Sequence, residues 1–309
     1  MRLLVAVLLV LAVSVAVFGL LWLAPGDPAQ ILLGTRAATP EALAAVRAQY
    51  GLDRPVPVQY LHWLGSMLRF DFGESIQTRE PVSTVLAQRA PVTAELAVFA
   101  IVLVVVVAVP AGMLAAARRG RAADSVVTGL STLAVSAPPF ALGILLLSVF
   151  GAELGWFPVF GAGDEGWDRI RHLTLPAVAL AAGQAAVVVR QTRASALNVY
   201  GQDYLTFARA RGLPPALVWG RYAVRNASLP VVTTIGLLLA SGVTGAVLIE
   251  QTFSLKGLGA LAVSAIDSKD IPVVQVITVL VAVAVVLGNL AVDLLQVALD
   301  PRVRRQVLG

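Results

Sequence analysis

Six long apolar stretches constrain what this sequence of 309 residues can fold into. The first runs from Leu3 to Ala24, 22 residues without a charged side chain. At about 1.5 Å per residue a helix of that length measures about 33 Å, enough to cross a hydrocarbon core of roughly 30 Å. A backbone in lipid must satisfy its own hydrogen bonds, so each stretch is predicted to be a helix. The other five cover approximately 94–117, 125–150, 173–195, 230–250 and 273–299.

Composition and patterning exclude the other architectures. Only 13% of the residues are charged, about half of the roughly 25% typical of soluble proteins. A β-barrel needs short alternating segments, and a soluble bundle needs polar helix faces, which VLVVVVAVP lacks. The first stretch is too long for a signal peptide and has no small-residue cleavage site before Pro25. We therefore predict an all-α integral membrane protein with six transmembrane helices. Pro110 and the pair Pro138–Pro139 lie inside apolar runs and are expected to kink them.

The arginines and lysines predict the orientation. With both termini on one side, that side holds 13 of the 23 basic residues but only four of the 18 acidic ones. The two shorter loops on the other side hold only Arg169, Arg171, Lys256 and Lys269. By the positive-inside rule, both termini and the segment 197–229 are cytoplasmic. The protein is thus expected to be a multi-pass protein of a bacterial cell membrane.

The spans divide the chain into four parts. Residues 1–25 form the first transmembrane helix, 26–91 an extracytoplasmic segment with short helices, 92–300 the main transmembrane domain, and 301–309 a cytoplasmic tail. In segment 26–91, which is too polar to enter lipid, TPEALAAVRAQYG reads as a helix capped by Thr39 and ended by Gly51. Two roles stay open for this segment: a lid packed on the helices, or a surface that docks or gates an external partner.

The sequence lacks the residues that several classes of function require. The chain has no cysteine, and its two histidines, His62 and His172, are far apart and receive no role. It contains no HExxH motif, no nucleophile–base set, and no Gly-Lys dipeptide for a phosphate-binding loop. The net charge of +5 comes from arginines beside apolar runs and does not indicate nucleic acid. We expect no catalytic residues, no metal and no cofactor bound by this chain, and no nucleic-acid partner.

The segment 204–230 is basic and interrupted by Gly and Pro. Asp203 can cap a helix that begins near Tyr204, and Gly212 provides a stop that tolerates a positive φ. Pro214 and Pro215 suit the start of a second short helix, from Ala216 to about Asn226. Two short helices joined by an elbow favour a docking site, although a basic loop that only anchors topology is the simpler alternative.

The residues ARARGLPPALVWGRYAVRNASLPVV, 208–232, resemble the cytoplasmic coupling loop of ABC importer permeases of the dipeptide/oligopeptide family. Further stretches match that family in order along nearly the whole chain. The chain is similar to the first, B-type, permease of that family. The matching stretches are APGDPAQILLG, YGLDRPVPVQYLHWL, DFGESIQTREPV, QRAPVTAEL, GAVLIEQTFSLKGLGALAVSAIDSKDIPVVQ and NLAVDLLQVALDPRVR.

Small departures from the family pattern do not touch the glycine elbow. Arg211 stands where lysine is common, Phe207 where threonine is common, and Tyr222 where histidine is frequent. Lys256 stands where an aromatic residue or proline often precedes the Gly-Leu-Gly. The change at Lys256, in an outer loop, could alter contact with an external partner.

The resemblance implies a type I ABC importer permease fold and a division of labour. A second homologous permease would complete the translocation path, two ABC ATPase subunits would bind ATP and Mg, and an extracytoplasmic solute-binding protein would deliver the substrate. The coupling loop would dock on an ATPase. Its candidate contact residues are Arg209, Arg211, Gly212, Leu213, Leu217, Trp219, Arg221 and Arg225.

Polar residues inside the spans are candidates for the translocation path, although hydrogen bonding between helices is the commoner role for any one of them. Glu250 ends the fifth span on the outer side; it could meet a peptide amine, but a solvated carboxylate at a helix end is the commoner case. The remaining candidates are Thr128, Ser131, Ser136, Gln184, Thr233, Thr234, Ser241 and Thr244.

Di- or oligopeptides are the expected cargo. Related permeases carry nickel, haem or glutathione, so these cargoes stay open. A standalone channel or ion-driven transporter is the alternative from another class; it would need charge relays inside the membrane, whereas charges here lie only near span ends.

Overall fold

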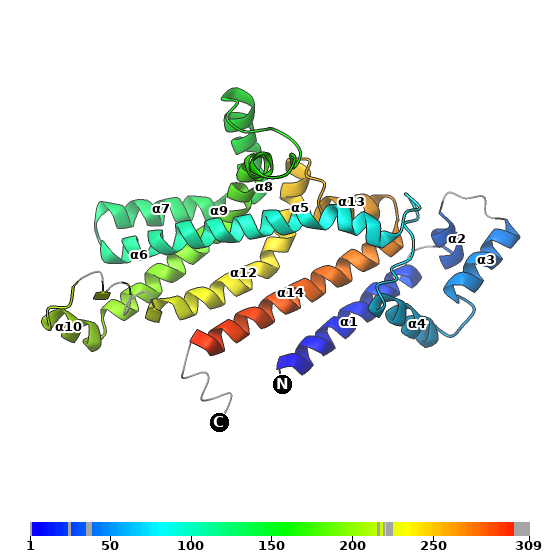
Figure 1. Ribbon diagram of the computed structural model, residues 1–309, viewed down its shortest axis with the longest axis horizontal. Helices are drawn as coiled ribbons and strands as arrows, with labels where there is room; N and C mark the ends of the chain where they lie inside the picture. Colours follow the sequence, from blue (N-terminus) through cyan, green and yellow to red (C-terminus); the bar gives the residue numbers. More distant parts are fainter. Residues whose placement is uncertain are drawn as a thin grey trace. The chain divides into compact units, whose positions relative to one another are not determined.

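The computed structural model describes residues 2–23, 26–34, 39–214, 217, 218, 220 and 225–299. Within these ranges the regular structure is helical, and the only strand-like pairing is one isolated bridge between Glu74 and Pro81. The helices are α1 (Arg2–Leu23), α2 (Pro28–Leu33), α3 (Pro40–Tyr50), α4 (Val56–Leu68), α5 (Val82–Leu103), η1 (Val104–Ala108), α6 (Val109–Ala117), α7 (Ala122–Ser136), α8 (Pro139–Leu146), η2 (Leu147–Glu153), α9 (Trp167–Tyr200), α10 (Asp203–Ala210), α12 (Arg225–Thr252), α13 (Leu258–Asp267) and α14 (Ile271–Leu299) (Figure 1).

The apolar helices confirm an all-α membrane protein. Four helical stretches in the described part of the chain are long and apolar enough to cross a bilayer: Leu4–Leu23, Val82–Ala117, Trp167–Tyr200 and Ile271–Ala298. A fifth candidate is the pair Ala122–Ser136 and Pro139–Glu153. The expected span 230–250 lies in α12, where several side chains fall outside the described set. Six spans therefore stays a prediction.

The expected third span, 125–150, is not one kinked helix. Its two halves meet at an angle of 104°. The residue before a proline is driven toward extended backbone, and Ala137 (ψ 125°) and Pro138 (ψ 136°) are both extended. Pro110, in contrast, does not interrupt its helix. The π-helical turn η1 ends two residues before it, at Ala108, and the helix Val82–Ala117 continues through.

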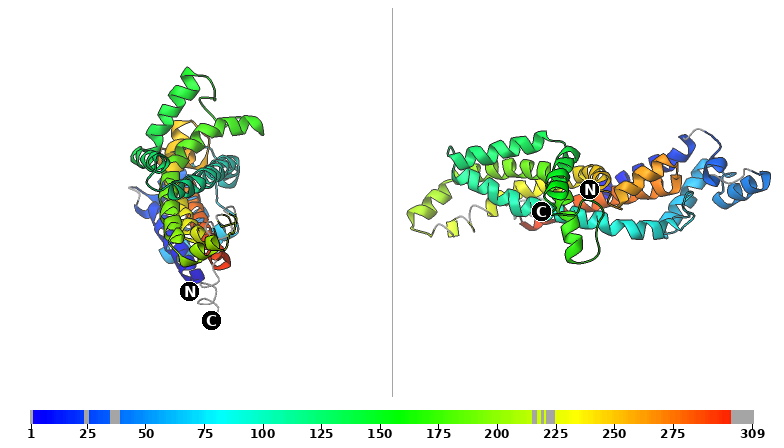
Figure 2. Two further views of the ribbon diagram at one scale, coloured as in Figure 1. Left: turned by 90° about the vertical axis from the view of Figure 1, so that its left-hand side faces the viewer. Right: turned by 90° about the horizontal axis from the view of Figure 1, so that it is seen from above.

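The chain forms two compact units, one made of residues 1–93 and 256–287, the other of 94–255 and 288–309. In the second unit, α9 packs against α6, α7, α8 and α12 (Figure 2). Close approach of α6 to α9 depends on Gly112, where an added Cβ would lie 2.6 Å from the Cβ of Thr192. Gly236 plays the same role between α12 and α14, facing Val292. Small residues at helix contacts are typical of membrane proteins.

In the first unit, the predicted helix caps of segment 26–91 are present. The Thr39 hydroxyl accepts a hydrogen bond from the Ala42 amide (3.2 Å), and Gly51 ends α3 with φ 62°. The stretch around Ser75 is tied to the start of α14, because Asp270 accepts hydrogen bonds from the Ser75 hydroxyl and the Ile76 amide. Both side chains are buried.

Candidate functional site

The predicted first helix of the basic segment is α10, which begins at Asp203 and ends at Ala210. Gly212 follows with φ 72°, and the Leu213 amide donates back to the Ala208 carbonyl (3.2 Å). This is the left-handed stop that the sequence predicts. Nothing lies within 4 Å of a Cβ built on Gly212, so the glycine is required by backbone conformation and not by space.

The helix predicted after the Gly-Leu-Pro-Pro elbow is not confirmed as a separate element. The expected second helix, 216–226, falls mostly outside the described residues. Its proposed end near Asn226 is wrong, because Arg225 and Asn226 already belong to α12, which continues through Pro230. A proline so close to a helix start disturbs only the carbonyl of the first turn, here that of Asn226.

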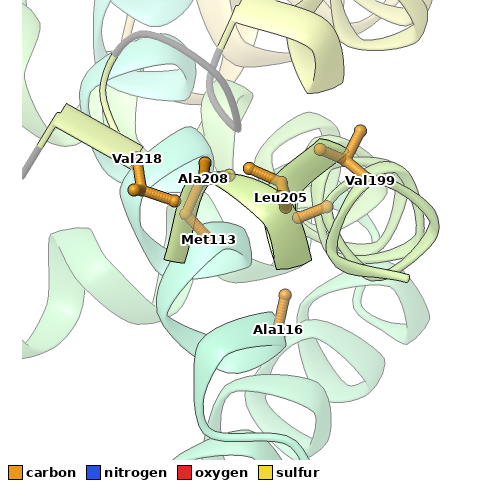
Figure 3. Close-up of a cluster of buried hydrophobic side chains, with 7 residues drawn as sticks. Met113, Ala116, Val199, Leu205, Ala208 and Val218 are labelled. Atoms are coloured by element: carbon orange, nitrogen blue, oxygen red, sulfur yellow. The ribbon is translucent and has the colours of Figure 1, made fainter. Parts of the chain in front are cut away.

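One face of α10 is anchored on the ends of two long helices (Figure 3). Leu205 is completely buried and Ala208 nearly so, together with Val218 beyond the elbow. They pack against Met113 and Ala116 of α6 and Ala196 and Val199 of α9. A buried leucine contributes about 2 kcal/mol, so α10 cannot shift far without moving these helices or losing that contact.

The other face of α10 is free for a partner in the described structure. Tyr204 is 39% exposed and Phe207 70% exposed, with Arg211 and Gly212 exposed beside them. Two large aromatic side chains and an arginine are the residue types that dominate protein interfaces. In the sequence, Phe207 stands out only as a departure from the family pattern. Its position three residues after Tyr204 puts both side chains on the same face of the predicted helix, and this spacing could have identified Phe207 as a candidate contact.

The candidate coupling residues are thus not equivalent. Leu213 is partly buried and packs against the cluster that anchors α10. Leu217 is 36% exposed. Trp219 and Arg221 lie outside the described residues, as do the side chains of Arg209 and Arg225.

An ion pair missed in the sequence lies on the neighbouring helices. Asp124, in the first turn of α7, accepts two hydrogen bonds from Arg193 of α9, at 2.6 and 2.8 Å. The Gly120 amide also donates to this carboxylate (3.0 Å). The Asp124 side chain is only 8% exposed. The pair joins the turn between α6 and α7 to α9, and 69 residues separate its members, so no local pattern announces it.

Three of the described candidate path hydroxyls bond the backbone of their own helices. Ser131, buried, donates to the Val127 carbonyl (2.7 Å), and Ser136 and Thr234 make the same type of bond. A hydroxyl bonded in this way still has acceptor capacity. Thr128 lies near Asp124, with 3.5 Å between its hydroxyl and the carboxylate.

Two of the path candidates face other helices. Thr233 of α12 accepts a hydrogen bond from Gln296 of α14 (2.9 Å), as expected for contact between helices. Gln184 of α9 lies against Gly242 of α12: a Cβ on that glycine would come within 2.9 Å of the amide nitrogen. The side chains of Ser241 and Thr244 are outside the described set.

Glu250 is not the solvated carboxylate that the sequence favoured. Its side chain is completely buried. The chain folds back after α12: the Leu255 amide donates to the Glu250 carbonyl (2.8 Å), and Phe253 and Leu255 are both buried. The apolar fold-back covers the helix end that the sequence placed in solvent. Among the described residues, no group of three or more His, Asp or Glu side chains could hold a metal ion.

Two family models match the chain. Residues 108–305 match the inner membrane component of binding-protein-dependent transport systems, and residues 1–97 match the N-terminal region of such components. Together they cover nearly the whole sequence.

Full-length relatives carry peptide-transport names. The chain is 39% identical to the probable peptide ABC transporter permease y4tP of Sinorhizobium fredii, with 98% of each chain covered. It is 38% identical to the glutathione transport system permease GsiC of Salmonella choleraesuis and 37% identical to the oligopeptide transport system permease AppB of Bacillus subtilis, in both cases over 98% of this chain and 97% of the relative.

A solved structure has a similar fold. The inward-facing MetNI methionine ABC transporter aligns with a TM-score of 0.59 at 18% identity, covering 72% of this chain and 99% of the matched one. Identity this low supports the fold alone.

Proposed function

The chain belongs to the family of binding-protein-dependent transport system inner membrane components, and from this premise we propose that it forms half of the translocation path of an ATP-driven peptide importer. It is a multi-pass permease subunit of the inner membrane and not an enzyme. Its partners in the proposal are a second permease, two ATPases that bind ATP and Mg, and an extracytoplasmic binding protein.

The cargo proposal rests on the relatives that match over 98% of this chain and are named for peptide, oligopeptide or glutathione transport. Glutathione is itself a tripeptide, so both kinds of name point to short peptides. GsiC specifically favours glutathione as the second candidate cargo. Nickel and haem, the alternatives left by the sequence, have no comparable support in these names.

The coupling proposal rests on the two faces of α10. Its inner face packs on α6 and α9, and its outer face presents Tyr204, Phe207 and Arg211. An ATPase that gripped the outer face would displace α10 when it bound ATP. Because the inner face is packed, the displacement would pass to α6 and α9 as a bias between two transport states. A differential affinity of a few kcal/mol suffices for such a bias.

Purification of the intact complex tests this function. The tagged chain is extracted in mild detergent, co-eluting subunits are identified, and the ligand on the binding protein is analysed by mass spectrometry. We expect a second permease, two ATPases, and a short peptide or glutathione. A chelated metal or haem as ligand would overturn the cargo proposal. Elution of the chain without other subunits would overturn the proposal that it is a subunit of an importer complex.

A further inference from the structure

Helix α4 packs beside the apolar helix α1, and its contacts lie several residues before the C-terminal end of α1. The Tyr60 hydroxyl shares a 2.8 Å hydrogen bond with the Ser14 hydroxyl. The rings of Tyr60 and Trp63 both lie 5.6 Å from that of Phe18. Ser14 and Phe18 precede the end of α1 at Leu23 by nine and five residues, or about 13 and 8 Å along the helix axis.

A second helix gives the same depth. Gln275, four residues into α14, donates a hydrogen bond to the Val17 carbonyl (3.2 Å). At the level where α4 contacts α1, α14 has therefore already completed its first turn. Both Ser14 and Gln275 are buried, whereas Val15, at the same level of α1, is 54% exposed on an apolar surface. Exposed valine at that depth of a spanning helix faces lipid.

The face of α4 that does not contact α1 is exposed, and it is apolar except for His62. Val58, Leu61 and Leu68 are 42%, 65% and 74% exposed. Their spacing of three and seven residues, with Gly65 between, forms one stripe along the helix. No atom lies within 4 Å of a Cβ built on Gly65. The stripe is therefore continuous and uncovered in this chain.

Charged residues stand at both ends of α4. Asp53 and Arg54 precede it, Arg69 and Asp71 follow it, and all four are exposed. The helix has 13 residues, about 20 Å, which is too short to cross a core of roughly 30 Å. A short helix with an apolar stripe and charged ends is suited to lie along the membrane surface, with Tyr60 and Trp63 at the interface where such rings collect.

We propose that α4 is embedded in the interfacial layer of the bilayer, with the stripe Val58, Leu61, Gly65 and Leu68 against lipid acyl chains. Segment 26–91 is then not entirely aqueous, because α4 is its membrane-bound part. The depth of the Ser14 and Phe18 contacts selects lipid over a soluble partner, because a soluble protein would have to reach below the ends of α1 and α14.

Spin labelling tests the proposal directly, because the chain has no cysteine and any introduced cysteine is unique. Leu61→Cys and Leu68→Cys are labelled in the assembled transporter in liposomes, and collisions with oxygen and with a water-soluble nickel chelate are compared. Leu8→Cys, 55% exposed on α1, is the lipid reference, and Ala44→Cys, exposed on the polar helix α3, is the water reference.

We expect both α4 labels to match Leu8→Cys, with an oxygen-to-nickel collision ratio about tenfold above that of Ala44→Cys, because a charged chelate is excluded from hydrocarbon. A ratio equal to that of Ala44→Cys would place α4 in water and overturn the proposal. Low collision rates with both reagents would show that a protein covers the stripe, which overturns it equally. The two sites are independent, so failure of one variant to assemble leaves the other as the test.

Discussion

Asp124 and Arg193 are the residues that most directly hold the α6–α7 turn against α9. The guanidinium donates two hydrogen bonds to one carboxylate, and the Gly120 amide adds a third. Two parallel bonds fix orientation as well as distance. Arg193 lies only three residues before Ala196, which belongs to the cluster that anchors α10. The ion pair therefore stiffens the part of α9 on which α10 rests.

Substitution of Arg193 should reduce the stability of the protein more than substitution of an exposed arginine. We expect Arg193→Met to lower the free energy of unfolding by more than Arg47→Met does, because it leaves a carboxylate that is 8% exposed without its cation. Arg47→Met is the matched control: Arg47 pairs with Asp27 at the same distance of 2.6 Å, but the two side chains are 43% and 32% exposed. There the expected loss is below about 1 kcal/mol.

Thermal and denaturant unfolding of the two variants in the same detergent measures the difference. Equal losses would show that the Asp124–Arg193 pair carries no more stability than a surface pair. Its role would then be confined to orientation.

At the scale of elements, α10 and its glycine stop form the unit to which the coupling proposal assigns force transmission. Gly212 has φ 72°, whereas Gly201, at the other end of α10, has φ −80°. Both glycines are exposed, and a Cβ at either would meet at most ordinary contacts. The main difference between the two positions is therefore the sign of φ.

Valine substitutions at Gly212 and Gly201 therefore form a matched pair of variants. A β-branched residue is strongly disfavoured at positive φ, so Gly212→Val should displace the elbow, at a cost of about 2 kcal/mol, while Gly201→Val should not. We expect Gly212→Val to keep ATP hydrolysis in the assembled transporter but to lose most of the substrate transported per ATP. Uptake and hydrolysis are measured together in proteoliposomes. Normal coupling in Gly212→Val would exclude the elbow from force transmission.

Elements fixed by short-range chemistry were predictable from the sequence, and those fixed by distant contacts were not. Thr39 and Gly51 act within a few residues, and their helix has the predicted ends. The break at Pro138 was expected as a kink, because sequence cannot tell whether neighbours will rescue a helix after two prolines. Burial of Glu250 depends on the fold-back through Leu255, and the Ser75–Asp270 contact joins residues 195 apart.

At the scale of the whole molecule, composition alone indicated the fold class, because 58% hydrophobic residues in long runs leave few alternatives to a helical membrane protein. The family matches then support the importer fold. What composition cannot decide is whether the bent pair Ala122–Ser136 and Pro139–Glu153 crosses the bilayer or re-enters on the same side. That single element determines whether the chain has an even or an odd number of crossings.

Three cysteine variants decide the number of crossings and the orientation together. Arg119 follows α6, Asp164 precedes α9, and Lys256 follows α12; all three are exposed. If the bent pair crosses, Arg119 lies on the opposite side from Asp164; α9 and α12 then cross twice, which returns the chain to the side of Asp164 at Lys256. The positive-inside rule places Arg119 in the cytoplasm.

We therefore expect a membrane-impermeant maleimide to label Asp164→Cys and Lys256→Cys in intact right-side-out vesicles, and Arg119→Cys only after permeabilisation. Labelling of all three from one side would mean that the bent pair re-enters, and the prediction of six spans would be wrong. The reverse pattern would keep six spans but invert the protein, which would put α10 on the side away from ATP and remove the physical basis of the coupling proposal.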